Sequence, residues 1–234
     1  MRYVAPATMP DFVSGARIMN GGFTTSRNAL AAHKLTQLRR EPLACAEYRH
    51  LVRHISLLLA YEVTLALPAE EVKFEARGWL ASGSSLGIDP VIVPILRTGL
   101  VMAEAFQEVM PQTLTGHIGL HRDKGDPNRK LLQYLVSLPD PKGRLVILLD
   151  PVIATGDTAC RALEIAKRRG AEDISFVSLV VSRPGRDRLV QEHPDVHFYC
   201  VAVDETVNEA GQVLPGLGSV SERLFGFRTK STHI

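Results

Sequence analysis

The chain has 234 residues, of which 45% are hydrophobic and 22% are charged, as is usual for a globular domain with a sizeable core. Its formal net charge is +2, so the composition gives no sign of a nucleic-acid partner or a membrane surface. Three cysteines far apart in the chain, Cys45, Cys160 and Cys200, predict neither a disulfide framework nor a zinc knuckle, and without an apolar targeting segment we expect a cytoplasmic protein.

The first quarter of the chain predicts an arm and two helices. Residues 1–24 mix prolines and glycines with scattered apolar residues, which indicates an irregular N-terminal arm ahead of a single domain over residues 25–234. Apolar spacing predicts a helix over residues 28–40 and a longer one over about 43–67. His50 and His54 lie one turn apart on the second helix, but no third metal ligand accompanies them. We therefore assign them to a solvated helix face.

The segment after the second helix predicts an exposed element. Residues 72–77 alternate between apolar and polar side chains, which indicates a short, half-exposed strand. The run Gly83-Ser84-Ser85 predicts a turn. Trp79 lies between them, and we expect it to serve packing rather than recognition.

Two further strands follow, each leading into a loop with cationic residues. Residues 90–96 form an apolar run that ends at Arg97, and a helical run continues to Met110. A strand over residues 114–121 leads into a loop over residues 122–130 that carries four cations and two acids. A solvated hairpin would explain such a loop, and its Gly and Pro content also suits a mobile lid.

The next run, over residues 145–150, predicts an apolar strand that ends at a carboxylate. It is apolar up to Asp150, so we expect both faces of the strand to be covered, as in a parallel sheet. The turn over residues 154–158 contains Gly156 and two threonines and precedes a helix over residues 159–170. Its amides and the helix N-terminus suit a phosphate group. The same pattern also fits a purely structural role, in which Asp150-Pro151 ends a strand and Thr158 caps a helix.

The last third continues the alternation of strands and helices. We expect a strand over residues 174–181, a short helix over 184–193, a strand over 197–203 and a glycine-rich loop over 208–226. Such alternation predicts an α/β fold with a parallel, twisted sheet flanked by helices. Because parallel strands end at one edge of their sheet, Arg97 should lie opposite the phosphate-binding turn.

Four segments together resemble the uracil phosphoribosyltransferase family over about residues 28–228. They are Pro94-Ile95-Leu96-Arg97-x-Gly99, the loop that begins at Arg122, Asp150-Pro151-x-x-Ala154-Thr155-Gly156, and Pro215-Gly216-Leu217-Gly218. The resemblance implies a phosphoribosyltransferase fold with a small hood formed by the C-terminal glycine-rich segment. It also implies the conversion of uracil and 5-phosphoribosyl 1-diphosphate (PRPP) to UMP and diphosphate, a step of pyrimidine salvage.

The resemblance further implies roles for individual residues. Asp150, Arg97 and Arg122 are expected to be catalytic. PRPP is expected to bind a larger set: Arg97, Arg122, Asp150, Pro151, Val152, Ile153, Ala154, Thr155, Gly156, Asp157, Thr158 and Ser219. Uracil is expected to bind Val213, Gly218, Ser219 and Val220. Mg²⁺ is the expected cofactor, held mainly by the substrate diphosphate rather than by protein ligands. A homodimer or higher homo-oligomer and an allosteric nucleotide are further expectations.

The chain departs from the family pattern in several places, including the later part of the loop, where Asn128-Arg129-Lys130-Leu131-Leu132 replaces the family's Pro-x-x-Tyr stretch. His121 stands where the family has Tyr, Thr98 where Ala is usual, Gln212 where Tyr is usual, and Ser219 where Asp is usual. Two alternatives therefore stay open. One is a phosphoribosyltransferase of the same fold with altered base specificity, and the other is a weakly active protein that senses PRPP or a nucleotide.

Overall fold

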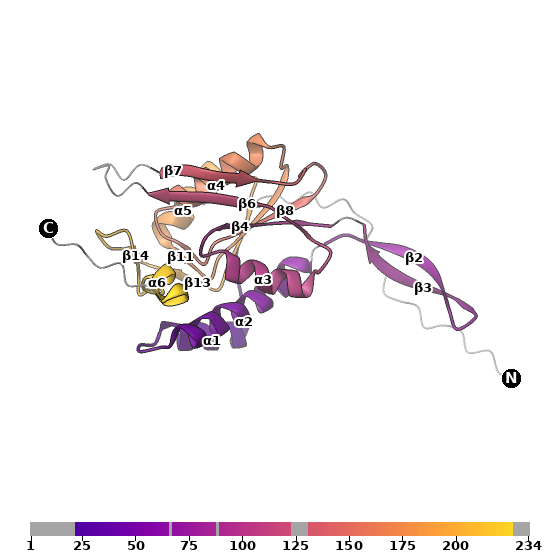
Figure 1. Ribbon diagram of the computed structural model, residues 1–234, viewed down its shortest axis with the longest axis horizontal. Helices are drawn as coiled ribbons and strands as arrows, with labels where there is room; N and C mark the ends of the chain where they lie inside the picture. Colours follow the sequence, from indigo (N-terminus) through magenta and orange to yellow (C-terminus); the bar gives the residue numbers. More distant parts are fainter. Residues whose placement is uncertain (1–21, 66, 88, 123–130, 227–234) are drawn as a thin grey trace.

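The computed structural model describes residues 22–65, 67–87, 89–122 and 131–226 (Figure 1). Strands and helices alternate along most of this part, and the expected α/β fold with a mainly parallel sheet is confirmed. Among the described helices, none combines the length and the apolar character needed to cross a membrane.

The main sheet has the strand order β1-β12-β10-β8-β4-β6-β7, with β5 paired to β4. Every neighbouring pair is parallel except β6 and β7, which form an antiparallel hairpin. The strands are β1 (Gly22–Thr25), β4 (Val91–Leu96), β5 (Leu114–Thr115), β6 (His117–Arg122), β7 (Leu131–Ser137), β8 (Leu145–Leu149), β10 (Asp173–Val177) and β12 (His197–Cys200).

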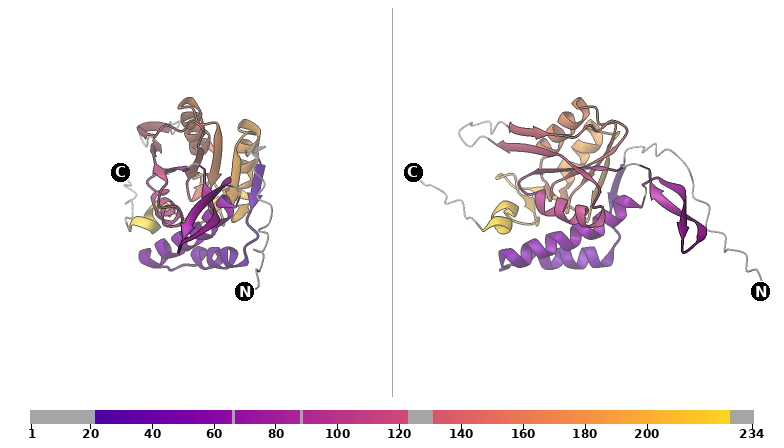
Figure 2. Two further views of the ribbon diagram at one scale, coloured as in Figure 1. Left: turned by 90° about the vertical axis from the view of Figure 1, so that its right-hand side faces the viewer. Right: turned by 45° about the vertical axis from the view of Figure 1, so that its right-hand side comes forward.

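Helices cover both faces of this sheet, as the apolar strand over residues 145–150 predicts (Figures 1 and 2). Within β8, Leu145, Ile147 and Leu149 pack into one core with helices α1 (Ala29–Arg39), α2 (Cys45–Thr64) and α3 (Leu100–Val109). Val146 and Leu148 pack into a second core with α4 (Asp157–Arg168) and α5 (Arg183–Glu192). Successive side chains of a strand point to opposite faces, so a strand between two helical layers is apolar at every position.

Two predicted strands are each divided between two sheets. The run predicted over residues 174–181 separates into β10 and β11 (Val180–Ser182), and the run over 197–203 separates into β12 and β13 (Ala202–Asp204). The second strand of each pair joins a small parallel sheet of order β13-β11-β9, in which β9 is Val152–Ile153. Both halves are apolar, so composition does not reveal the break.

The glycine-rich C-terminal segment is more ordered than the predicted loop. It contains β15 (Val213–Leu214), which pairs antiparallel with β14 (Thr206–Val207) just before the segment, and then the short helix α6 (Val220–Phe225). In Figure 1 these elements lie together at the end of the molecule opposite to β2 and β3.

The N-terminal prediction needs one correction. Residues 22–24 do not belong to an irregular arm, because β1 pairs in parallel with β12 and extends the main sheet. The predicted first helix is confirmed as α1, whose first amides are capped by the Asn28 side chain. The rest of the predicted arm lies outside the described residues.

The prediction for residues 70–89 is wrong in two respects. Strands β2 (Ala69–Ala76) and β3 (Trp79–Leu86) form one antiparallel hairpin, so Gly83-Ser84-Ser85 lies inside a strand instead of a turn. The turn is at Arg77-Gly78. Trp79 is 79% exposed and does not serve packing within this chain. The hairpin projects away from the sheet and its helices (Figures 1 and 2).

The predicted lid over residues 122–130 can be described only at its start. Arg122 is the last residue of β6, and β7 resumes at Leu131, a strand that the sequence pattern does not predict. Residues 123–130 lie outside the described part of the chain.

Candidate functional site

A cavity of about 1100 Å³ lies at the carboxyl edge of the parallel sheet. We call residues 152–158, from β9 to the start of α4, the phosphate loop, and residues 213–220 the base segment. Both line the cavity in part, together with the turn over residues 207–212. The remaining lining residues are Thr98, His121, Arg122, Asp150, Ala159 and Ser221.

The pairing of β4 with β8 brings Thr98 and Asp150 together at the cavity. β4 and β8 are parallel neighbours in which Pro94 is level with Leu149, so the residues that follow each strand meet. The Thr98 hydroxyl donates a hydrogen bond of 2.9 Å to the Asp150 carboxylate. The expectation that the two strand ends face one edge is therefore confirmed.

Asp150 is held in a desolvated position. Its backbone carbonyl accepts a hydrogen bond of 2.6 Å from the Ser178 hydroxyl, and its amide donates to Val177 O at 3.2 Å. Burial raises the pKa of Asp150 to about 7, and the hydrogen bond from Thr98 opposes this change.

The phosphate loop owes its shape to Gly156 and to the small sheet. Gly156 has φ 85°, a left-handed conformation that favours glycine, and it is the N-cap of α4. β9 pairs with β11, and Ser182 hydrogen-bonds the carbonyl of Ala154. The loop therefore presents the N-terminus of a twelve-residue helix to the cavity. Such a terminus attracts an anion through its free amides and its partial positive charge.

Asp157, at the start of α4, accepts hydrogen bonds from the guanidinium groups of Arg122 and Arg188. Arg122 Nη2 donates to its carboxylate at 2.7 Å, Thr155 Oγ1 donates at 2.7 Å, and Arg188 from α5 also donates to it. Burial alone would raise the pKa of Asp157, but these hydrogen bonds lower it to about 2. Asp157 therefore stays ionised and holds the Arg122 side chain beside the phosphate loop.

The base segment is fixed by buried polar contacts with helices α1 and α2. Asp204, which is 7% exposed, accepts a hydrogen bond of 2.9 Å from the Gly216 amide and one of 2.8 Å from Arg39 Nη2. The Leu217 carbonyl accepts from the Tyr48 hydroxyl at 3.3 Å and from Arg223 Nη1 at 3.0 Å.

Conformation restricts the same segment. Gly216 has φ 55°, and an added Cβ would lie 2.1 Å from the Val213 carbonyl oxygen. Glycine is therefore required at that position of the turn.

The structure brings most of the predicted site residues to one cavity. These are Arg122, Asp150, Val152, Ile153, Ala154, Thr155, Gly156, Asp157, Thr158, Val213, Gly218, Ser219 and Val220.

Two predicted residues do not line the cavity. The buried Pro151 points its carbonyl at the amides of Leu179 and Val180, and the Arg97 guanidinium lies 5.4 Å from the centre of the Phe225 ring. Arg97 still follows β4 directly, next to the lining residue Thr98.

Several residues around the site were not singled out from the sequence. Arg188, Asp204, Arg39, Tyr48 and Arg223 act on the phosphate loop or the base segment from distant parts of the chain. Asp204 directly follows the strand predicted over residues 197–203. The rule that placed Asp150 at the carboxyl edge could thus have marked Asp204 as well. The others carry no comparable local signal.

Several known proteins are similar to this chain over most of its length. The family model described as uracil phosphoribosyltransferase matches residues 25–227. The chain is 44% identical over 200 residues to the uracil phosphoribosyltransferase of Dictyoglomus turgidum, covering 84% of this chain and 95% of that protein. It is 40% identical over 208 residues to the enzyme of the same name from Streptococcus salivarius, covering 88% and 99%.

A solved structure supports the same assignment of fold. The AQ2163 protein from Aquifex aeolicus superimposes with a TM-score of 0.84 at 26% identity, covering 89% of this chain and all of that one.

Proposed function

The chain belongs to the uracil phosphoribosyltransferase family, and from this premise we propose which residues hold each substrate and how they act. The family reaction joins N1 of uracil to C1 of the ribose of PRPP, with loss of the N1 proton and release of diphosphate, giving UMP. The observation that supports our assignment best is the single cavity shared by the phosphate loop, Asp150, Arg122 and the base segment.

We assign the 5-phosphate of PRPP to the phosphate loop. The site offers the amides around Gly156, the hydroxyls of Thr155 and Thr158, and the N-terminus of α4. Asp150 lies at the end of the neighbouring strand, where its carboxylate can accept hydrogen bonds from the ribose hydroxyls. The Asp150–Thr98 bond holds that carboxylate in one orientation.

The leaving diphosphate calls for positive charge at the opposite end of the sugar. Arg122 lines the same cavity, where Asp157 holds its guanidinium beside the phosphate loop. On binding of the substrate this side chain would turn toward the diphosphate, because an arginine fork matches two phosphate oxygens. Arg97 would contribute after a movement of its side chain away from Phe225. As the bond from C1 to the diphosphate oxygen breaks, the ribose becomes cation-like and the electron pair moves to the diphosphate. Charge placement stabilises this transition state.

The cavity also suits Mg²⁺. The Asp150 carboxylate and the Thr98 hydroxyl are hard oxygen donors, and Mg²⁺ prefers one or two such groups together with substrate phosphates. When bound, the ion would neutralise part of the diphosphate charge. We propose Asp150, with the substrate itself, as the place where the ion is held.

Uracil is assigned to the base segment. Backbone amides and carbonyls near Gly218 can match the donor and acceptor edge of the base, while Val213 and Val220 offer apolar contacts. The contacts of Asp204 and Arg223 keep these backbone groups in place before the base arrives. A preformed hydrogen-bonding site rejects bases with a different edge.

A homodimer is proposed from the β2–β3 hairpin. Its exposed apolar side chains are Val72, Phe74, Trp79, Leu80 and Leu86, and they lie on an element that projects from the rest of the chain (Figure 1). A projecting apolar hairpin on a monomer would expose a large patch to water, and a second copy would cover it.

The function is tested by steady-state assays with PRPP, Mg²⁺ and one base at a time. Uracil, cytosine, hypoxanthine and xanthine are compared, and the nucleotide formed is identified by chromatography. We expect UMP from uracil and little product from the other bases. If another base reacts and uracil gives no UMP, that base and not uracil is the substrate. Saturable PRPP binding without any turnover would instead support a sensor.

A further inference from the structure

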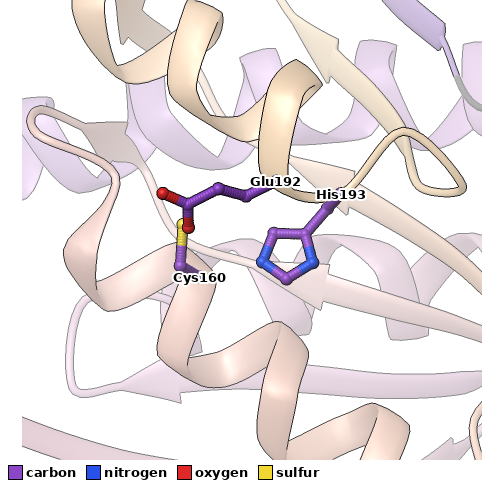
Figure 3. A group of neighbouring side chains, drawn as sticks. All are labelled: Cys160, Glu192 and His193. Carbon is purple, nitrogen blue, oxygen red and sulfur yellow. The ribbon is translucent and has the colours of Figure 1, made fainter.

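A second group of chemically reactive side chains lies between α4 and α5. Cys160 is in the first turn of α4, Glu192 is the last residue of α5, and His193 follows it as the C-cap (Figure 3). One ligand atom from each residue, the Cys160 sulfur, a Glu192 carboxylate oxygen and a His193 ring nitrogen, lies within 4.8 Å of the other two. This cluster, which we call the α4–α5 triad, has no part in the proposed transfer reaction.

The His193 ring is buried with one nitrogen unused. His193 is 7% exposed, and its Nδ1 lies 3.2 Å from Lys167 Nζ. Its Nε2 has no hydrogen-bond partner in the described part of the chain. Figure 3 shows a ring nitrogen turned toward the Cys160 sulfur and the Glu192 carboxylate. A buried polar atom without a partner is uncommon and indicates a missing ligand.

The other two residues complete a set of donors. Cys160 is 3% exposed, and its sulfur lies within 4.8 Å of a Glu192 carboxylate oxygen. Burial, followed by this contact, raises the pKa of the Cys160 thiol to about 12. Glu192 is exposed, and one of its carboxylate oxygens accepts a hydrogen bond of 2.8 Å from Arg188 Nε.

We propose that Cys160, Glu192 and His193 bind a transition-metal ion of the zinc class, with water as a fourth ligand. A thiolate, an imidazole nitrogen and a carboxylate are the donors that Zn²⁺ takes in proteins. Two negative ligands also neutralise a divalent ion. The ion would tie α4, which follows the phosphate loop, to the end of α5. Mg²⁺ is not expected here, because it prefers oxygen ligands alone.

Two rearrangements accompany binding. The ligand atoms must approach one another by about 1 Å, because tetrahedral zinc sites place neighbouring S and N ligands roughly 3.6 Å apart. Metal on Nε2 also moves the ring proton to Nδ1, so Lys167 must release His193 and keep its ion pair of 2.7 Å with Asp195. Lys167 thus opposes the metal, both by this contact and by its charge.

Cobalt provides the direct test, because a cysteine ligand gives Co²⁺ a thiolate charge-transfer absorption. Untagged protein is stripped with a chelator and titrated with Co²⁺. We expect one ion per chain with this absorption, displaced by Zn²⁺ but not by Mg²⁺. Cys160→Ser should abolish the absorption, while Cys45→Ser, a change at a cysteine remote from the triad, should leave it intact. Absence of the absorption in the wild type, or its persistence in Cys160→Ser, would overturn the proposal.

Cys160→Ser changes a buried residue and could unfold the protein, so two variants at more exposed positions test the same site. Glu192→Gln should weaken Zn²⁺ binding by at least about tenfold, and Lys167→Met should tighten it. Lys142→Met, on a distant loop, serves as the control. Zn²⁺ should also raise the Tm of the wild type, because a ligand that binds the folded state stabilises it. Equal Zn²⁺ affinity in all four proteins would show that the triad is not the site.

Discussion

The hydroxyl of Thr98 donates a 2.9 Å hydrogen bond to the carboxylate of Asp150, and this contact joins the ends of two neighbouring parallel strands. Thr98 directly follows Arg97, the residue that the sequence pattern singled out, and it replaces the alanine usual in the family. The contact opposes the effect of burial on Asp150. The ionised form of this carboxylate is therefore better stabilised than burial alone would allow.

Asp150→Asn is expected to lower kcat about 10²- to 10³-fold with the fold intact, because the amide keeps the shape but not the charge beside a cation-like sugar. Steady-state kinetics and circular dichroism check this. Asp140→Asn, an exposed site distant from the cavity, is the matched control. Near-normal kcat in the Asp150 variant would remove this residue from the mechanism.

The raised pKa of Asp150 also predicts a dependence of stability on pH. The folded pKa of about 7 exceeds the unfolded value of 3.8, so the folded state holds the proton more tightly. Ionisation therefore costs stability as the pH rises from about 4 to 7, on the order of a few kcal/mol. Denaturant unfolding at several pH values should show the wild type losing stability relative to Asp150→Asn over this range. Parallel curves for the two proteins would contradict the prediction.

Asp204→Asn should raise the KM for uracil by about tenfold or more, while the KM for PRPP changes little. The variant loses a charged acceptor for the Gly216 amide, and hydrogen bonds to charged groups are worth roughly 1.5–3 kcal/mol. Glu205→Gln, the next residue along the chain, is exposed and serves as control. An equal rise in both KM values would indicate a general loss of structure instead of a role in the base segment.

Ser219→Asp is expected to tighten PRPP binding, because it restores the acid that the family carries after Pro-Gly-Leu-Gly at the wall of the cavity. The KM for PRPP should fall, with Ser219→Asn as a neutral control of the same shape. An unchanged KM would show that this position does not contact the sugar diphosphate.

The exposed apolar side chains of the β2–β3 hairpin predict that the protein is a homodimer. Trp79 and Leu80 are 79% and 77% exposed, so replacing both by Asp should leave a folded chain that no longer dimerises. Light scattering coupled to size exclusion measures the mass directly. Lys73→Asp, on the same hairpin, should retain the dimer. A wild-type protein that is monomeric at assay concentrations would refute the proposal.

Much of the fold could be read from the sequence because it depends on local periodicity. The apolar run before Asp150, the helical spacing after Asn28 and the glycines after Leu214 each carry a short-range signal. The breaks between β10 and β11, and between β12 and β13, carry none, since both halves are apolar. The β2–β3 hairpin was misread because its glycine and serines lie in a strand that is exposed along most of its length.

The sequence by itself determined the α/β alternation, the phosphate loop and the place of Asp150, because each follows from residues close together in the chain. Tertiary structure decided the partners of these residues. Asp204 meets Gly216, Arg188 meets Asp157, and Cys160 meets His193 across separations of 12 to 33 residues. Such contacts depend on how the sheets and helices pack, and no local pattern of apolar and polar residues encodes that packing.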